Sequence, residues 1–261
     1  MPNRKPRETI VHDLNGPAVA AFALELRADF SSPPHQHPRG QMIGCSRGAL
    51  SILTDLGARV VPAGYAIWLP PHHKHGGESY GPGAGWSVYI APEACRTLPD
   101  RPRTVLVTSL LREAILRAAS WEDDRMDDSR QRIADLVVDE IGRLPAEVFG
   151  LPMPCDERLQ RIARALLKHP EDGRTINEWA RWAGSTCRTL SRRFPKETGL
   201  SFTEWRQRAR LMRSLEMLAE GQSVTSIALE LGYNSVSGFI ALFRRKFGVT
   251  PAAHPMARAA M

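Results

Sequence analysis

Short apolar runs that alternate with polar positions dominate the N-terminal part of the chain. The clearest of them span residues 20–26, 40–46, 48–55, 58–64 and 85–91, with glycine and proline between them. Successive side chains of a strand point to opposite faces, so a period of two indicates strands. Short strands about ten residues apart, separated by turn signals, are typical of a small sandwich or barrel. This region is therefore predicted to be all-β.

The hydrophobic period then changes to that of helices. Residues 96–107 are expected to leave the β domain, and helices are predicted over residues 108–120 and 129–144. The second helix carries one apolar face, formed by Ile133, Leu136, Val137, Ile141 and Leu144 beside Glu140. This face either packs on the β domain or forms a helix-on-helix contact between two chains. We expect a homodimer, which suits the reading of paired DNA half-sites.

Proline and glycine mark residues 144–154 as the clearest linker. The pattern divides the chain into a β domain over residues 1–103, a helical linker or dimerisation region over 104–154, and an all-α domain over 155–261. The expected fold class is α+β.

The C-terminal domain contains nearly the same segment twice, over residues 175–199 and 223–248. Equivalent positions are Ala180 and Ala228, Gly184 and Gly232, Phe194 and Phe243, and Gly199 and Gly248. Each copy has a short amphipathic helix, a turn ending in glycine, and a second helix. This layout predicts helix-turn-helix motifs at about residues 175–196 and 223–247, whose second helices enter a DNA major groove. The second copy carries one extra residue after its glycine turn.

Local signals place the helix ends in this domain. Thr175 and Glu178 form a capping box, and a long helix over residues 202–219 connects the two motifs. Leu190 and Phe194 are the expected core anchors of the first recognition helix. Pro195 removes a backbone donor, so we expect that helix to end near Phe194.

The net charge of +7 is concentrated at the C-terminal end. Residues 1–100 hold 9 Lys and Arg against 8 Asp and Glu, and residues 101–150 hold 8 against 10. Residues 151–261 hold 18 against 10, a net charge of +8. Basic charge can simply aid solubility, but together with the repeated motif it favours phosphate binding.

Cysteine spacing and hydropathy indicate a cytoplasmic protein without a membrane span. The four cysteines form no C-x-x-C pair, which favours reduced thiols over a disulfide framework or a zinc site. No apolar run is long enough for a membrane helix, and the N-terminus lacks the apolar segment of a secretion signal.

Histidines with metal-ligand chemistry lie within the β domain. His35 and His37 would point to the same side of a strand, and His75 follows in a second histidine-rich segment. Here the chain resembles the cupin family, matching its two motifs at His35, His37, Gly48, Gly64, Pro70 and His75. It departs from them at Gln41 for glutamate, His72 for glycine and Ser79 for asparagine. The resemblance implies a cupin-like β-barrel.

The change from glutamate to Gln41 leaves the role of this cluster open. An amide binds a hard divalent ion more weakly than a carboxylate does. His35, His37, Gln41 and His75 therefore either hold a divalent metal, line a small-molecule pocket without metal, or form internal hydrogen bonds only. No cofactor is required. The aromatic residues Tyr65, Trp68, Tyr80, Trp86 and Tyr89 are interpreted as core.

The C-terminal domain resembles the AraC/XylS family of transcription regulators over about residues 156–255. The motifs that carry the resemblance are F-x-x-E-T-G at 194–199, A-x-x-x-G-Y at 228–233 and F-x-x-x-F-G-V-T-P at 243–251. The segments around His35 and His75 resemble those of the nitroimidazole-resistance-regulator subgroup. The resemblance implies a sensor domain for a small-molecule effector in front of a module that binds double-stranded DNA.

The resemblance also implies which residues contact DNA. In the first recognition helix the base-reading positions are Arg188, Ser191 and Arg192; in the second they are Val236, Ser237, Ile240 and Ala241. Arginine can bind guanine bidentately, whereas aliphatic side chains reach only thymine methyls or sugars. We therefore predict that the first helix carries most base specificity. The second would give register and phosphate contacts through Asn234, Ser235, Ser237, Arg244 and Arg245.

These observations favour a sequence-specific transcription regulator controlled by an effector in the β domain, and not an enzyme. A metal-dependent cupin enzyme with a DNA-binding tail is the alternative, which tightly bound stoichiometric iron, manganese or zinc would favour. A purely architectural DNA binder would leave the near-neutral β domain unexplained.

Overall fold

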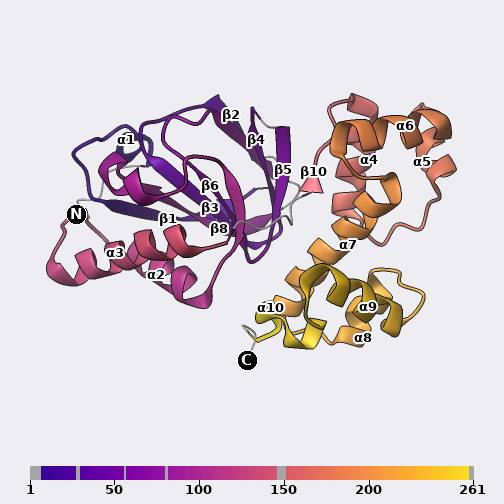
Figure 1. The fold of residues 1–261 in the computed structure, drawn as a ribbon. Coiled ribbons are helices and arrows are strands. Elements are labelled where there is room, and N and C mark those ends of the chain that lie inside the picture. The colour runs from indigo at the N-terminus through magenta and orange to yellow at the C-terminus, as the bar shows by residue number, and fades with distance from the viewer. Residues whose placement is uncertain (1–6, 28–29, 56, 80–81, 146–150, 259–261) are drawn as a thin grey trace. The chain divides into compact units, whose positions relative to one another are not determined.

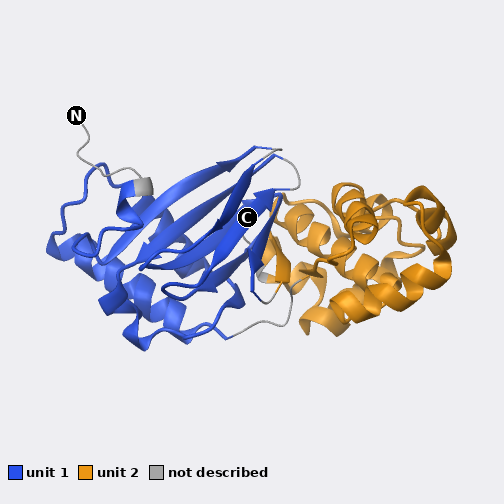
Figure 2. Ribbon diagram, turned by 90° about the horizontal axis from the view of Figure 1, so that it is seen from above, with its two compact units in different colours: residues 1–56, 63–150 blue, residues 57–62, 151–261 orange. Residues whose placement is uncertain are grey.

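The computed structural model describes residues 7–27, 30–55, 57–79, 82–145 and 151–258 (Figure 1). The chain forms two compact units, the first of residues 1–56 and 63–150, the second of residues 57–62 and 151–261 (Figure 2). Within the described ranges, none of the helices has the length and apolar content needed to cross a membrane. The limits proposed above for three domains stay a prediction.

Strands arranged in two sheets confirm the expected all-β domain. Their bounds are β1 (Val19–Leu26), β2 (Ser31–His35), β3 (Gly40–Arg47), β4 (Ala49–Thr54), β5 (Gly57–Pro62), β6 (Tyr65–Leu69), β7 (His75–Ser79), β8 (Gly83–Ile90), β9 (Arg103–Leu106) and β10 (Leu151–Pro152). One sheet has the order β1-β8-β3-β6-β9 and the other β10-β5-β4-β7-β2. The described pairings of β1 with β8, β3 with β6 and β8, and β7 with β2 and β4 are antiparallel.

Helices α2 (Ser109–Ala119) and α3 (Asp128–Arg143) cover one face of the first sheet. Val137, Ile141 and Leu144 join Trp68 and Trp86 in one buried core, with Ile133 and Leu136 packed against it. The apolar face anticipated for the second linker helix is therefore used inside the unit. Trp68, Trp86, Tyr65 and Tyr89 are all buried, while Tyr80 lies outside the described residues.

Four strands differ from what the sequence pattern indicated. β2 and β7 contain proline and glycine pairs rather than alternating residues. β9 adds an edge strand beside β6 where the chain was expected to leave the β domain. β10 forms at the end of the predicted linker, where Leu151 pairs with Val60 of β5. The linker residues 146–150 lie outside the described ranges.

The C-terminal unit consists mainly of helices. Their bounds are α4 (Glu157–Lys168), α5 (Ile176–Trp182), α6 (Cys187–Thr198), α7 (Phe202–Ala219), α8 (Val224–Glu230), α9 (Val236–Phe247) and α10 (Pro255–Arg258). α5 with α6, and α8 with α9, are the two helix-turn-helix motifs, and α7 runs from the first to the second (Figure 1). Smaller elements are α1 (Arg7–Ile10) and the 3₁₀ turns at Pro92–Thr97 and Pro251–Ala253.

The repeat is confirmed in detail. The extra residue of the second copy lies in its turn, because 183–186 separate α5 from α6 and 231–235 separate α8 from α9. Gly184 and Gly232 both take the left-handed conformation, with φ of 66° and 70°, which glycine adopts without steric cost. The anchors Leu190 and Phe194 are fully buried, as are Phe239 and Phe243 of the second copy.

Pro195 does not end the first recognition helix. α6 continues past it to Thr198, so the expected end near Phe194 is wrong. A proline inside a helix loses one hydrogen bond, but the last turn is held by others. The Thr198 hydroxyl donates to the Phe194 carbonyl at 2.7 Å, and the Gly199 amide donates to the Pro195 carbonyl at 2.8 Å.

Candidate functional site

The histidines singled out above come together in the first unit. His35 ends β2 and lies directly opposite His75, the first residue of β7. His37 follows in the connection to β3 rather than on the same strand as His35. One nitrogen of each ring lies within 4.8 Å of the others, a spacing at which they could hold one metal ion. His37, His75 and Gln41 are buried, while His35 is exposed.

Backbone carbonyls fix the orientation of the three imidazole rings. Nδ1 of His37 lies 2.8 Å from the Arg39 carbonyl, and Nδ1 of His75 lies 2.7 Å from the His73 carbonyl. Nδ1 of His35 lies 2.9 Å from the Pro33 carbonyl. A carbonyl only accepts, so each Nδ1 carries the proton. In a neutral ring, Nε2 then presents a lone pair, which is the tautomer of many metal-bound histidines.

Burial keeps two of these rings neutral. It lowers the pKa of His75 to about 4 and also lowers the pKa of His37. At neutral pH, neither Nε2 carries a proton that it could donate.

The side-chain oxygen of Gln41 faces the Nε2 lone pairs of both His37 and His75. Its Oε1 lies 3.1 Å from Nε2 of His37 and 2.8 Å from Nε2 of His75, while its Nε2 donates to Ser87 and Tyr89 hydroxyls. Three acceptor atoms thus meet without a proton between them, an arrangement that a cation would stabilise. Rotating the amide by 180° also resolves it, because the NH₂ group then donates to both histidines and the hydroxyls donate to its oxygen. The site is therefore compatible with a metal-bound and a metal-free state.

Ser87 and Tyr89 were missed by the sequence reading, which assigned Tyr89 to the core. They are two residues apart on β8 and so point to the same face as Gln41 on neighbouring β3. The pairing of Gln41 with Tyr89 across β3 and β8 brings these side chains together, and the sequence alone does not show how the two strands pair.

His72, which replaces the glycine of the cupin motif, lies in the loop before His75. Its φ is 60°, the left-handed region that explains why glycine suits this position. The His72 amide donates to the His37 carbonyl at 2.9 Å, which ties together the two loops that carry the cluster.

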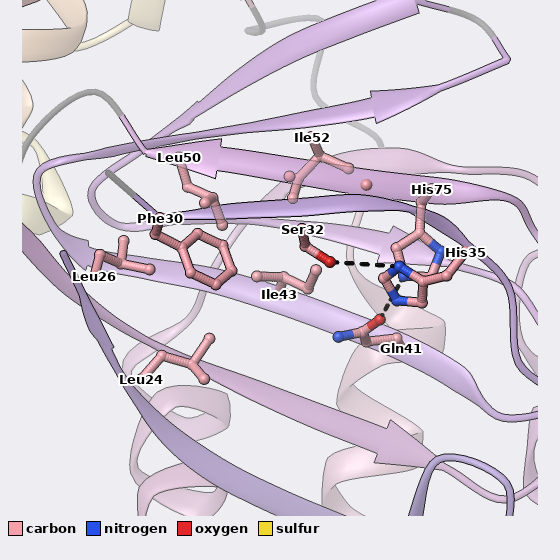
Figure 3. A pocket seen from close by; sticks show the side chains of 12 residues that line it. Leu24, Leu26, Phe30, Ser32, His35, Gln41, Ile43, Leu50, Ile52 and His75 are labelled. Carbon is pink, nitrogen blue, oxygen red and sulfur yellow. Dashed lines mark hydrogen bonds between the residues drawn. The ribbon is translucent and has the colours of Figure 1, made fainter. Parts of the chain in front are cut away.

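An apolar cavity leads to the cluster (Figure 3). Its apolar part is formed by Leu24, Leu26, Phe30, Ile43, Leu50 and Ile52. Its polar end is formed by Ser32, His35, Gln41 and His75; Figure 3 shows His35, Gln41 and His75 on the right, with Ser32 between them and the apolar residues. The empty space there is about 360 Å³, a figure that includes the part open to solvent.

The first recognition helix presents its predicted contact residues to solvent. Arg188, Ser191 and Arg192 are exposed on α6, opposite the buried Leu190 and Phe194. Thr186 caps this helix by accepting from the Thr189 amide. The exposed side chains thus point away from the core and lie on one helix.

The second recognition helix presents a different surface. Ser237, Ala241, Arg244 and Arg245 of α9 and the preceding Asn234 and Ser235 are exposed, while Val236 and Ile240 are partly buried. The Ser235 hydroxyl accepts from the Gly238 amide at 3.1 Å, so it caps α9 and retains only its proton for a phosphate.

Comparison with known proteins gives the family. A profile described as a helix-turn-helix domain matches residues 179–254, and one described as an AraC-like ligand-binding domain matches residues 18–130. The HTH-type transcriptional regulator NimR of Escherichia coli is 31% identical over 241 residues, 92% of this chain and 88% of NimR. The chain belongs to the AraC/XylS family of transcription regulators.

Two further similarities are shorter or more distant. The HTH-type transcriptional regulator RipA of Corynebacterium glutamicum is 35% identical over 100 residues, which are 38% of this chain and 30% of RipA. The solved structure of ToxT from Vibrio cholerae O395 aligns with 94% of this chain and 99% of its own, at 12% identity and a TM-score of 0.41.

Within the AraC/XylS family, this chain is a transcription regulator with an AraC-like ligand-binding domain and a DNA-binding domain of two helix-turn-helix motifs. The histidine cluster and its cavity lie in the matched ligand-binding region, and α6 and α9 lie in the matched helix-turn-helix region.

Proposed function

We propose that this regulator binds a small-molecule effector in the cavity beside His35, Gln41 and His75, and that the effector changes its affinity for DNA. The observation that supports this proposal is the cavity itself, apolar along its length and polar at one end. Such a combination is typical of small-molecule sites, where apolar walls give affinity and a few polar groups fix orientation.

The lining residues restrict the chemistry of the effector. Among the described residues that line the cavity there is no Lys, Arg, Asp or Glu, and burial keeps His75 neutral. An anionic headgroup would enter without a counter-charge, which is costly in a buried site. The effector is therefore mainly apolar, with one polar end that donates a hydrogen bond to the cluster or coordinates a metal held there.

The proposal includes a metal-bound and a metal-free state of the cluster. In the metal-bound state, a divalent metal is held by His35, His37, Gln41 and His75. Neutral imidazoles suit zinc, copper, iron and nickel, and the three histidines have their lone pairs free to bind. Such an ion would supply a Lewis-acidic centre for the polar end of the effector. Because the described ligand set contains no carboxylate, the ion would be held less tightly than by three histidines and glutamate.

A metal-dependent cupin enzyme remains the second candidate, and the histidine cluster is the observation that favours it. The relatives that match this chain are transcription regulators, which implies a role other than catalysis. An effector response in DNA binding separates the two functions, because an enzyme with a DNA-binding tail has no need of one.

We also propose that the protein acts as a homodimer on double-stranded DNA, in the cytoplasm where that DNA lies. The first recognition helix would read bases through Arg188, Ser191 and Arg192. The second would mainly contact phosphates.

Blocking the cavity tests the effector proposal. Ile52 and Leu53 are neighbours on β4 that face opposite ways, Ile52 buried in the cavity wall and Leu53 exposed. Apolar compounds with one polar end are screened by the rise in melting temperature, with and without added zinc, and positive compounds are tested for their effect on DNA binding.

Ile52→Trp is expected to abolish the response while DNA binding without effector stays unchanged, and Leu53→Trp is expected to retain it. If every compound acts equally on both variants, the cavity is not the effector site. Metal analysis of the purified protein shows which state of the cluster is present.

A further inference from the structure

Two arginines of the connecting helix α7 form hydrogen bonds within the protein that the regulator function does not explain. Arg206 and Arg210 lie one helical turn apart, both partly buried. Burial lowers the pKa of both guanidinium groups, as expected for charges withdrawn from water. Both donate to backbone carbonyls rather than to carboxylates.

Arg210 contacts both helix-turn-helix regions at once. Its Nε donates to the Pro170 carbonyl at 2.8 Å and its Nη2 to the Glu171 carbonyl at 3.3 Å, in the loop that precedes the first motif. Its Nη1 donates at 3.4 Å to the carbonyl of Gly232, in the turn of the second motif. The guanidinium also lies 5.7 Å from the ring centre of Tyr233, the next residue of that turn.

Arg206 holds the same loop from the neighbouring turn of α7. It donates to the carbonyl of Arg174 at 3.0 Å and to the carbonyl of Asp172. The loop is stiffened further because the Asp172 carboxylate pairs with Arg174 at 2.6 Å. The Arg174 guanidinium in turn lies 3.8 Å from the ring centre of Trp179, in the first helix of the first motif.

The glycine turns of the two motifs show that this contact belongs to the second turn alone. A Cβ atom added at Gly184 would meet nothing within 4 Å. The same atom at Gly232 would lie 3.2 Å from the Glu171 carbonyl oxygen and 3.4 Å from Nη2 of Arg210. The second turn is therefore packed against the loop of the first motif, with Arg210 between them.

We propose that Arg210, supported by Arg206, is a positioning residue that fixes the separation and rotation of the two recognition helices, and so the spacing of the DNA segments that this regulator accepts. α7 alone joins the motifs at its two ends. A shared helix alone would still allow each motif to rotate slightly relative to α7. One guanidinium that bonds to the loop before the first motif and to the turn of the second removes that freedom, because its donors form a fixed planar fork.

The consequence concerns the geometry of the bound DNA rather than base identity. Two recognition helices held rigidly fit major-groove segments about one helical turn, or 10 base pairs, apart. An insertion between the segments both lengthens and rotates their separation. A rigid protein then loses the contacts of one helix, whereas a protein with a loosened link retains part of them.

Arg210→Met tests the proposal with a matched control in Arg213→Met. Arg213 lies on the same helix and pairs with Glu216 within α7, so its loss removes the same charge without touching the link. A high-affinity site is first selected from random DNA with the full-length protein. Affinity is then measured for that site and for versions with one or two base pairs inserted between its two contacted segments.

The wild type and Arg213→Met are expected to lose affinity by about tenfold or more on insertion, the cost of roughly one lost base contact. Arg210→Met is expected to bind the unaltered site more weakly but to lose only about threefold or less on insertion, because its helices can adjust. An equal spacing penalty in Arg210→Met and Arg213→Met overturns the proposal, whatever their absolute affinities.

Arg210→Lys separates positioning from a loss of folding. Lysine keeps the charge but not the planar fork, so it is expected to give a spacing penalty between those of wild type and Arg210→Met, with a melting temperature close to wild type. If Arg210→Met does not fold, Arg210→Lys alone tests the proposal. A loss of affinity on insertion equal to that of the wild type overturns the proposal, and a smaller loss supports it.

Discussion

Gln41 decides what the histidine cluster can hold. A carboxylate at this position offers only acceptor atoms and a negative charge, so it suits a cation permanently. An amide offers a donor on one side and an acceptor on the other. Flanked by two neutral imidazoles and by two hydroxyls, it fits the site in either orientation. In the proposed metal site, glutamine in place of the cupin glutamate would therefore allow both an occupied and an empty state.

Gln41→Glu is expected to increase divalent-metal affinity by about tenfold or more, because it adds a negatively charged ligand to the three imidazole ligands. The measurement is a zinc titration against a competing chelator at neutral pH. Gln41→Met, which keeps the size but removes the oxygen, is the matched control and is expected to bind zinc more weakly than wild type. Equal affinities in all three proteins would show that residue 41 is not a ligand.

His254 makes the stability of the DNA-binding unit depend on pH. It is 2% exposed, with Phe243 and Phe247 rings at 5.5 and 5.2 Å, and burial lowers its pKa from 6.5 to about 4. Between these values the unfolded chain binds a proton that the folded protein does not. Stability therefore falls as pH drops from 6.5 towards 4, and this histidine adds no further loss below that range.

His254→Phe is expected to reduce the stability lost between pH 7 and pH 5 by about 2 kcal/mol, from 1.36 kcal/mol per pH unit below the unfolded pKa. Urea unfolding followed by tryptophan fluorescence measures it at both pH values. His169→Gln removes an exposed histidine and serves as the control. A pH dependence unchanged by His254→Phe would contradict this assignment.

At the scale of elements, helices followed from the sequence far better than strands. The caps Thr175 and Ser201 accept hydrogen bonds from the third residue beyond them, so local residues fix these helix ends. The segments that became β2 and β7 read SSPPH and HGGES, without alternation. They become strands only by pairing in the sheet, where β7 lies between β2 and β4, and that pairing depends on residues distant in sequence.

The candidate site shows the same division. The four residues of the cluster could be named because a spaced motif carries them. Their partners Ser87 and Tyr89 could not, since the register between β3 and β8 decides which side chains meet. Arg210 was visible as a helix arginine, but its acceptors are carbonyls of two distant turns, which no residue type marks.

The two recognition helices are expected to divide the work of DNA binding. Replacing Arg188, Ser191 and Arg192 of α6 by alanine removes bidentate donors, so discrimination between operator variants is expected to fall by about 1–3 kcal/mol for each base that is read. Replacing Asn234, Ser237 and Arg244 beside and on α9 is expected to weaken binding to all variants alike, with a smaller salt dependence. Binding assays over a panel of operator variants measure both.

Lys196→Ala provides a control for charge near α6, because this exposed residue lies in the last turn, away from the base-reading positions. An equal loss of base discrimination from the two alanine sets would refute the division between α6 and α9.

At the scale of the whole molecule, the apolar face of α3 on which dimerisation was predicted is occupied by the core of its own unit. Leu110 and Leu116 of α2 are exposed, and we expect them to contribute to the contact between two chains. Light scattering is expected to give twice the chain mass of 29.0 kDa, and Leu116→Glu is expected to reduce it to one chain. Leu229→Glu, an exposed position on α8, is the control. A wild-type mass of one chain would exclude the homodimer.

The C-terminal unit is not continuous in sequence. It includes β5, residues 57–62, which pairs with β10 at Leu151 and Pro152. The Pro152 carbonyl in turn accepts from the Trp205 indole of α7 at 2.7 Å. A single genetic crossover near residue 150 would therefore deliver a DNA-binding domain without its strand. A DNA-binding domain joined at that point to another sensor would have to pack against a strand supplied by the other protein's N-terminal part.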